Sequence, residues 1–256
     1  MNANPRPLDG RVAIVTGSSR RIGRATVEAL AAAGVAVVVN GVKAKDEAEA
    51  VAAGINASGG RAIAMLADVS KPEQAEALVN AAVSAFGGLD ILVNNAAVRR
   101  RTLLADITYE DWRQVTSIIL DGAFLCAKAA APHLGKSGHG RIINIGGWAN
   151  FHGAGGHAHV LAAKSGLVGL TKGLAHELGP AGVTVNLLSP GLVETPDDDP
   201  KRTAERRANF SMERIPLRRV GAPDDIARAV VALAGDDLAY MTGAVVHVNG
   251  GLYMSG

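Results

Sequence analysis

The chain has 256 residues, a length that one α/β domain reaches without dividing, and we expect a single domain over residues 1–256. With 26 Lys and Arg against 24 Asp and Glu, the formal net charge is +2, which gives no overall field for binding nucleic acid or an anionic membrane. Cys126 is the only cysteine, which excludes an internal disulfide and a cysteine-based zinc site and is typical of a reducing compartment.

Predicted strands and helices alternate along the whole chain. Ala-rich segments with helical spacing lie at about 22–33, 44–58, 72–86, 108–134, 157–178 and 223–234. Short β-rich runs alternate with them: Arg11–Thr16, Val35–Asn40, Arg61–Ala67, Asp90–Asn94, Gly140–Ile145, Val183–Leu188 and Ala244–Val248. These runs are continuously apolar, as expected for strands that helices cover on both faces. The pattern predicts an α/β fold with a parallel sheet.

The sequence shows no targeting or membrane segment. The first ten residues, MNANPRPLDG, are polar and contain two prolines. No apolar stretch reaches the roughly 18 residues that a spanning helix needs. We therefore expect a cytoplasmic protein that binds no membrane.

One long irregular stretch is predicted at about residues 189–218. It contains the acidic run Asp197-Asp198-Asp199 and several prolines. A loop of this length inside a compact domain usually forms a lid or a binding element, and we expect one of these roles here.

The first predicted strand ends in the turn Thr16-Gly17-Ser18-Ser19-Arg20-Arg21-Ile22-Gly23, directly before a helix. Gly17 permits a tight turn, and Gly23 lets backbone N–H groups approach a pyrophosphate at the positive end of the helix dipole. Two glycines at this spacing also fit an ordinary strand-to-helix turn. The turn is thus a candidate dinucleotide site that needs support from the rest of the chain.

Further landmarks follow in a fixed order: Asp68-Val69, Asn94-Asn95-Ala96-Ala97, Lys164 in a long helix, Pro190-Gly191-Leu192-Val193-Glu194-Thr195, and Asn249-Gly250-Gly251. Together with the first turn, they make the chain resemble the short-chain dehydrogenase/reductase family, especially its β-ketoacyl-reductase-like members. The resemblance covers nearly the whole chain. It implies a doubly wound Rossmann fold, with a mostly parallel seven-stranded sheet and helices on both faces.

The resemblance also implies a nucleotide cofactor and assigns its contacts. These are Gly17, Ser19, Arg20, Arg21, Ile22, Gly23, Asn40, Lys43, Asp68, Val69, Asn95, Ala96, Lys164, Pro190, Gly191, Val193 and Thr195. In the family, Asp68 would contact the adenine amino group and Thr195 the nicotinamide carboxamide, while Asn94 would brace the central strands. Asp68 and Asn94 would serve equally well as turn caps.

Two features favour NADP over NAD. The family normally has glycine where this chain has Arg21, a departure that resembles its NADPH-using branches. Arg20, Arg21 and Lys43 would form a fork for the adenosine 2′-phosphate, because arginine matches phosphate geometry with two hydrogen bonds. The second predicted strand ends in Asn40 rather than in the acid that binds a free ribose 2′-OH. The alternative is that the two arginines are only solvated residues at a helix start.

The family's proton-transfer residues are missing. With Lys164 as the reference, the tyrosine position holds Val160, the serine position holds Gly147 and the asparagine position holds Ile119. Residues 144–164 contain no serine, threonine or tyrosine, so a shifted register does not restore the set. General acid–base groups contribute about a hundred- to ten-thousandfold, and ordinary ketone reduction should be very slow.

A histidine is one candidate replacement. His157, Val160 and Lys164 are spaced to share a helix face, so His157 is a candidate catalytic acid beside Lys164. The alternative is that His152, His157 and His159 are partly exposed residues at the rim of the site. Because no acidic residue lies among these histidines, we expect no metal site.

Three arginines, Arg99, Arg100 and Arg101, follow the fourth predicted strand, where the loop borders the substrate cleft. One of them would bind a carboxylate or phosphate of the substrate. A solvated loop or a subunit contact explains them equally well.

Three functions remain open. The first is an atypical NADP-dependent oxidoreductase acting on a small molecule, such as an iminium, that demands less proton donation than a ketone. The second is a non-redox lyase or isomerase, and the third is a catalytically silent subunit of the family. We favour the first, because the cofactor residues and Lys164 are present. The resemblance also implies a homo-oligomer, either a tetramer or a dimer.

Overall fold

The computed structural model describes residues 7–195 and 211–255. Its seven strands are β1 (Val12–Val15), β2 (Ala36–Gly41), β3 (Arg61–Leu66), β4 (Ile91–Asn94), β5 (Arg141–Ile145), β6 (Thr184–Pro190) and β7 (Val245–Val248). They form one sheet in the order β3-β2-β1-β4-β5-β6-β7, and every neighbouring pair is parallel. Each strand lies within two residues of its predicted range, which confirms the doubly wound fold.

The main helices also follow the prediction. They are α1 (Arg21–Ala32), α2 (Lys45–Ala57), α3 (Pro72–Phe86), α4 (Tyr109–Thr116), α5 (Gly122–Ser137), α7 (Ala158–Leu178) and α9 (Pro223–Ala234). A π-helical segment, Ser117–Asp121, joins α4 to α5, so this helix is continuous over Tyr109–Ser137. A short helix that the sequence did not predict, α6, spans Ala149–His152.

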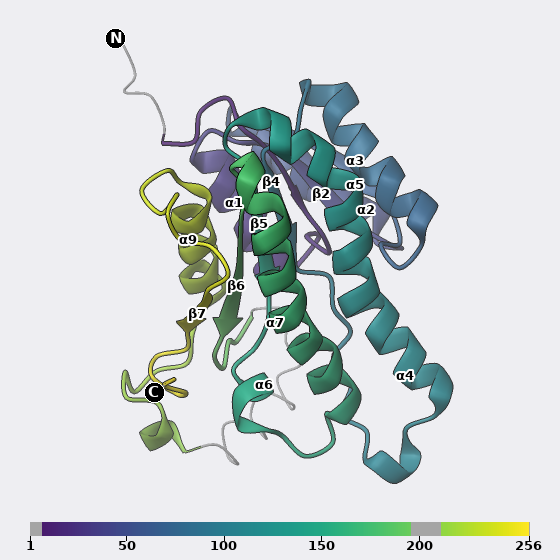
Figure 1. Cartoon of the computed structure of the whole chain (residues 1–256), viewed down its shortest axis with the longest axis vertical. Helices are drawn as coiled ribbons and strands as arrows, with labels where there is room; N and C mark the ends of the chain where they lie inside the picture. Colours follow the sequence, from purple (N-terminus) through teal and green to yellow (C-terminus); the bar gives the residue numbers. More distant parts are fainter. Residues whose placement is uncertain (1–6, 196–210, 256) are drawn as a thin grey trace.

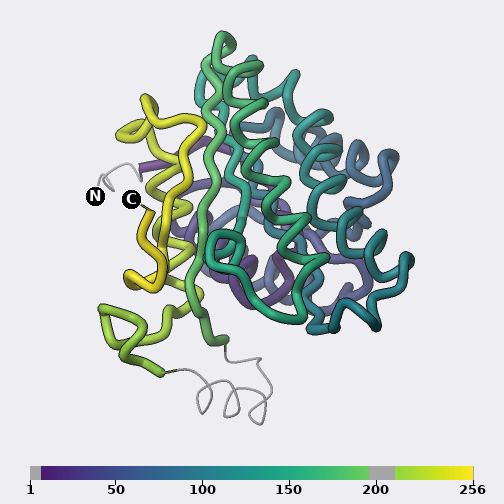
Figure 2. The backbone as a smooth tube through the Cα atoms, turned by 60° about the horizontal axis from the view of Figure 1, so that its bottom comes forward, coloured from purple at the N-terminus to yellow at the C-terminus, as the bar shows by residue number. Residues whose placement is uncertain are grey.

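Helices cover both faces of the sheet (Figure 1). One apolar layer packs α1, α2 and α9 against one face, and a second packs α3, α5 and part of α7 against the other. The strand residues are buried because they contribute alternate side chains to the two layers, such as Ala13 and Val15 to one and Val12 and Ile14 to the other. Figure 2 shows β7 and the C-terminal segment at one end of the molecule and α2 and α3 at the opposite end.

By length and composition alone, the helix Tyr109–Ser137 could cross a membrane, which the sequence reading did not anticipate. Its apolar residues Val115, Ile119, Cys126 and Leu134 are buried against other parts of the chain. Burial raises the pKa of the Cys126 thiol to about 12, so the only cysteine is an inert core residue. In its apolar 18-residue window 44% is buried, and the buried residues pack against α3, α7 and the sheet.

The parallel strands end at one edge of the sheet, and the chain order reverses between β1 and β4. Ligands of doubly wound sheets bind in the crevice at such a switch point. The predicted irregular stretch begins later than expected, because β6 continues to Pro190. Its central part, residues 196–210 with the acidic run Asp197-Asp198-Asp199, lies outside the described residues. The predicted role of this stretch as a lid or binding element therefore stays a prediction.

Candidate functional site

The turn after β1 brings two backbone segments too close for a side chain. Gly17 has a φ of 62°, in the left-handed region, and a Cβ on it would lie 3.0 Å from the Cα of Ala96. A Cβ on Gly23 would collide with the carbonyl oxygen of Gly17. The turn therefore brings bare backbone to the N-terminus of α1, where the helix dipole favours an anionic phosphate.

Polar side chains from two neighbouring strands hold this turn. Thr16 Oγ1 accepts hydrogen bonds from the backbone N–H groups of Asn95 and Ala96, each at 2.9 Å. Asn95 Nδ2 donates to the carbonyl oxygens of Thr16 at 2.9 Å and Gly17 at 3.0 Å. Gly17 N donates to Asn40 Oδ1 at 3.0 Å. The cradle is thus fixed to β2 and β4 by the protein's own bonds.

Asn40 has a structural role at the end of β2. It is 1% exposed, and its Nδ2 lies 3.1–3.3 Å from the carbonyl oxygens of Gly41, Met65 and Ala67. The side chain therefore joins β2, β3 and the glycine turn. Its predicted contact with a cofactor stays a prediction.

Three cations surround the open side of the turn. Arg20, Arg21 and Lys43 are exposed, and a Cβ on Gly41 would lie 3.8 Å from the Cβ of Ser19, so the segment that carries Lys43 runs beside the turn. Arg21 has a φ of 55°, a conformation that costs a non-glycine residue about 1–2 kcal/mol. Strained residues of this kind cluster at ligand sites. Here the chain has a positively charged side chain at a position whose backbone conformation favours glycine.

Two further landmark residues, Asp68 and Asn94, form hydrogen bonds with other residues of the chain. Asp68 Oδ1 accepts hydrogen bonds from Ser70 N at 3.0 Å and Ser70 Oγ at 2.7 Å, the turn-capping alternative of the sequence analysis. Asn94 Nδ2 donates to Asn144 Oδ1 at 2.9 Å, and Asn144 Nδ2 donates to Thr171 Oγ1 at 2.9 Å. Asn94 therefore braces β4 against β5 and α7, as the resemblance implied.

Lys164 is a buried amine at the end of β5. It is 8% exposed, and Nζ donates to the carbonyl oxygens of Ile145 at 2.7 Å and Gly146 at 2.9 Å. Burial, together with the smaller effect of repulsion from Arg99, lowers the pKa of Lys164 from 10.5 to about 7. The group can therefore gain or lose a proton near neutral pH.

The predicted tyrosine and asparagine positions form an apolar wall beside Lys164. Val160 and Ile119 are buried in one cluster with Val115, Leu167 and Leu187. The wall can exclude water, but it cannot transfer a proton.

The vacant serine position borders a carboxamide that the sequence analysis missed. A Cβ on Gly147 would have one heavy atom within 4 Å, Asn150 Oδ1 at 3.8 Å. Both side-chain polar atoms of Asn150 are buried and have no hydrogen-bond partner in the described part of the chain. Its sequence signal was modest: Asn150 is the only carboxamide between Ile145 and Lys164.

The three histidines lie in different surroundings. His157 is the N-cap residue of α7, half-buried, with Nδ1 3.0 Å from the carbonyl oxygen of Gly155, and its catalytic role stays a prediction. His152 Nε2 lies 3.2 Å from an Arg214 nitrogen. His159 is 0% exposed, so its expected place on an exposed rim is wrong, because α7 turns this residue inward beside Val160. Over residues 7–195 and 211–255, no three His, Cys, Asp or Glu side chains gather in a way that could hold a metal.

The structure separates the three arginines of the loop after β4. Arg100 pairs with Asp111 at 3.0 Å. The Arg101 side chain packs against Gly156, where a Cβ would lie 2.9 Å from Arg101 Cγ. Arg99 is exposed, and its charge acts on Lys164. The binding of an anionic substrate group by one of these arginines stays a prediction.

The remaining predicted cofactor residues lie near the same edge of the sheet. Ile22 is half-buried in the first turn of α1, and Val69 is buried. Pro190 ends β6, and Gly191, Val193 and Thr195 follow it. A Cβ on Gly191 would lie 2.6 Å from Asn249 Cα, so the chain passes close to the C-terminal segment. Nucleotide contacts by these residues stay predictions.

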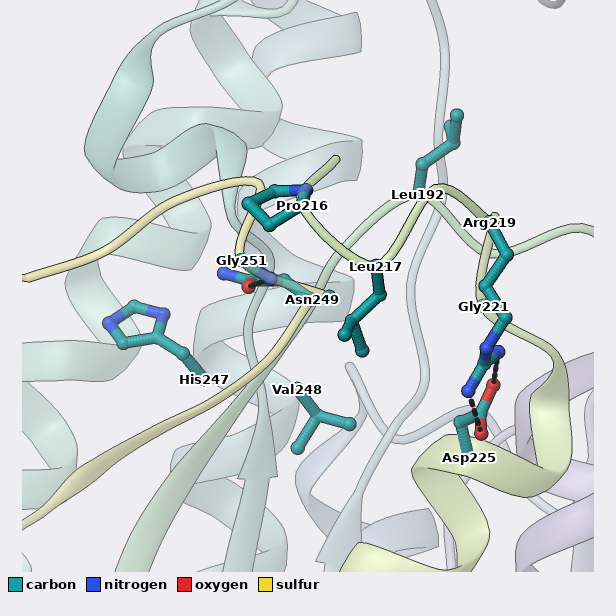
Figure 3. Close-up of a pocket in the computed structure, with 11 residues that line it drawn as sticks. Leu192, Pro216, Leu217, Arg219, Gly221, Asp225, His247, Val248, Asn249 and Gly251 are labelled. Atoms are coloured by element: carbon teal, nitrogen blue, oxygen red, sulfur yellow. Dashed lines mark hydrogen bonds and ion pairs between the residues drawn. The ribbon is translucent and has the colours of Figure 1, made fainter. Parts of the chain in front are cut away.

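A cavity of about 480 Å³ lies apart from these groups, between residues 216–221 and the C-terminal segment (Figure 3). Leu192, Leu217 and Val248 line it, and Arg219 pairs with Asp225 there through bonds of 2.6 and 2.9 Å. None of the predicted cofactor residues lines it. We assign no ligand to this cavity.

Comparison with known proteins covers almost the whole chain. The family model described as enoyl-(acyl carrier protein) reductase matches residues 17–253. The 3-oxoacyl-[acyl-carrier-protein] reductase of Synechocystis sp. is 43% identical over 248 residues, which are 96% of this chain and 98% of the relative. The (2S)-[(R)-hydroxy(phenyl)methyl]succinyl-CoA dehydrogenase subunit BbsD of Thauera aromatica is 39% identical over 244 residues, or 95% and 97% of the two chains.

A solved structure agrees with these relatives. A short chain dehydrogenase from Burkholderia cenocepacia, in complex with NADP, superposes with a TM-score of 0.87 at 37% identity. The match covers 95% of this chain and 98% of that one. Sequence and fold therefore point to the same group of proteins.

The buried amine of Lys164 predicts a pH-dependent stability. Between its folded pKa of about 7 and its ordinary value of 10.5, the unfolded chain binds more protons than the folded chain, so stability rises with pH. Relative to Lys164→Met, the free energy of unfolding of the unaltered protein should rise by about 2 kcal/mol from pH 7 to pH 9, measured with urea. Lys172→Met, at an exposed site on α7, is the control and should show no such difference. A difference that does not change with pH would contradict the assignment.

Proposed function

Because the chain belongs to the short-chain dehydrogenase/reductase family, we propose that it is an NADP-dependent oxidoreductase for a small, activated electrophile rather than for a simple ketone. The observation that carries the proposal is the contrast within the site. The turn keeps Gly17 and Gly23, whereas Val160 and Ile119 form an apolar wall at the proton-transfer positions. Such a site suits a reaction that needs a hydride but little proton donation.

The cradle fits a dinucleotide. Gly17 and Gly23 permit the tight turn that opens α1, whose N-terminus favours a pyrophosphate, and Arg20, Arg21 and Lys43 offer positive charge for a 2′-phosphate. NADPH, when bound, supplies the hydride. A relative of known structure carries NADP, which supports the same choice here. The other cofactor contacts named in the sequence analysis remain part of this proposal.

An iminium suits the groups that remain. Hydride addition to its carbon neutralises the positive nitrogen, so the product forms without a delivered proton while NADPH becomes NADP⁺. The apolar wall of Val160 and Ile119 excludes water from this step. Lys164, whose pKa is about 7, can hold or release a proton at Nζ for substrates that need one, with His157 as the alternative donor. Arg99 would bind an anionic group of the substrate.

A second candidate is a catalytically silent subunit. The apolar residues at the proton-transfer positions support it, and one relative is named as a subunit of a dehydrogenase. In that case the chain would bind the nucleotide and assemble with an active relative. We expect a homo-oligomer, a tetramer or a dimer in the cytoplasm, for the first candidate and a mixed assembly for the second.

Ligand titration and turnover test the proposed function. We expect NADPH to bind more tightly than NADH in a fluorescence titration, and NADPH oxidation with cyclic imines to exceed that with unactivated ketones by at least about a hundredfold. Turnover that persists without nucleotide would favour a lyase or isomerase. NADPH binding without turnover, together with a co-purifying active relative, would favour the silent subunit.

Arg21→Gly tests whether Arg21 binds the 2′-phosphate at the expense of stability. Glycine relieves the left-handed φ, so the free energy of unfolding should increase by about 1 kcal/mol. The lost cation should weaken NADPH binding about 10-fold and leave NADH binding nearly unchanged. Arg20→Gln is the control, because Arg20 has an extended φ of −155°: it should weaken NADPH binding without the gain in stability. Equal effects on both nucleotides would refute the 2′-phosphate assignment.

Restoring the missing hydroxyls tests whether they alone limit carbonyl reduction. Gly147→Ser has room, because a Cβ there meets only Asn150 Oδ1 at 3.8 Å. Combined with Val160→Tyr, it should raise ketone reduction by at least about a hundredfold, measured as NADPH oxidation. Gly147→Ser with Val160→Phe adds the same bulk without the phenol and should give no gain. If the Ser/Tyr variant folds and binds NADPH but reduces ketones no faster, the pocket differs from its relatives in more than these positions.

A further inference from the structure

Asn150 carries a buried carboxamide without a hydrogen-bond partner. Its Oδ1 and Nδ2 are both shielded from solvent and unbonded among residues 7–195 and 211–255. Leaving a buried donor and acceptor unpaired costs free energy, and such groups in folded proteins usually pair with a water, an ion or a ligand. The amide thus indicates a polar species that completes it.

The amide lies where the family's serine hydroxyl is missing. Oδ1 is 3.8 Å from the position of a Cβ on Gly147. The preceding residue, Gly146, accepts a hydrogen bond from Lys164 Nζ at 2.9 Å. Two polar side chains, Asn150 and Lys164, therefore flank the end of β5 beside the apolar wall.

The backbone around Asn150 is held in place. Asn150 N donates to the Gly147 carbonyl at 3.1 Å, and Trp148 N donates to the Pro190 carbonyl at 2.9 Å. The Phe151 ring packs against His247 and Tyr253, with ring centroids 5.1 and 5.4 Å apart. These contacts fix α6 to the end of β6, to β7 and to the C-terminal segment. The carboxamide is therefore positioned before a ligand arrives, which lowers the entropy cost of binding.

We infer that Asn150 is the substrate-binding residue that stands in place of the missing serine and that it recognises the N–H of a protonated cyclic imine. Oδ1, the atom that lies nearest the vacant serine position, accepts that N–H, and its partial negative charge complements the cation. A serine hydroxyl that polarises a ketone has the opposite polarity, since it donates to a carbonyl oxygen. This inference rests on the proposed function and adds the polarity of the substrate's reacting group.

The test compares Asn150→Ala and Asn150→Asp with the unaltered protein. The kcat/KM for NADPH-dependent reduction of pyrroline should fall at least about 10-fold in Asn150→Ala, with the Kd for NADPH unchanged. Asn150→Asp keeps the acceptor and adds negative charge, so it should retain or improve activity with pyrroline. Ser165→Ala, an exposed polar residue on α7, is the control and should change neither value.

A second readout does not depend on turnover. Pyrrolidine, the saturated amine, should bind the protein–NADP⁺ complex in calorimetry, more weakly in Asn150→Ala by at least about 10-fold and more tightly in Asn150→Asp. Thermal melting identifies any variant that fails to fold. If Asn150→Ala does not fold, Asn150→Leu takes its place, because leucine fills about the same space and buries no polar group.

The outcomes separate the inference from the proposed function. Pyrroline reduction that is equal in the unaltered protein and in Asn150→Ala overturns the role of Asn150 and leaves the function standing. Pyrrolidine binding that depends on Asn150, without pyrroline reduction, overturns the oxidoreductase and supports the binding site. Neither binding nor reduction, in a folded protein that binds NADPH, overturns both.

Discussion

The site depends on the bonds from Lys164 Nζ to the last carbonyl groups of β5. These bonds attach α7 to the strand end and set the direction of the chain as it leaves the sheet at Gly146. The same burial that makes the bonds strong lowers the pKa of the amine to about 7. One interaction therefore provides both the shape of the site and a group that titrates near neutral pH.

The polar residues of the glycine turn and the apolar residues of the Val160–Ile119 wall form two separate parts of the site. The glycine cradle and its flanking cations form an anion-binding region, and the Val160–Ile119 wall contributes nothing but shape. Because the cradle lies at the ends of β1, β2 and β4, whereas Val160 and Ile119 belong to α7 and to the helix Tyr109–Ser137, one could change without the other. The proposed nucleotide site and the replaced proton-transfer residues together would give an altered chemistry on the scaffold of the family.

Much of the fold could be predicted because continuous apolar strands and long amphipathic helices leave strong periodic signals. Short elements leave none: α6 has four residues among glycines, and only tertiary contacts reveal it. Burial of a polar residue is equally hard to predict, as His159 shows, because the helical spacing places it at the border of the inward face. The predicted cofactor set did not reveal that Asn40 and Asn95 hold the backbone of the turn after β1.

The packing of Phe151 on Tyr253 extends the site to the end of the chain. Asn150 precedes that ring by one residue, and Asn249, which lies against Gly191, bonds through Nδ2 to the Tyr253 carbonyl at 2.8 Å. The C-terminal residues thus support the segment that carries Asn150, the residue inferred above to bind substrate. An affinity tag fused there, or a truncation that removes Tyr253, would act on substrate recognition while leaving the nucleotide cradle at the other strands intact.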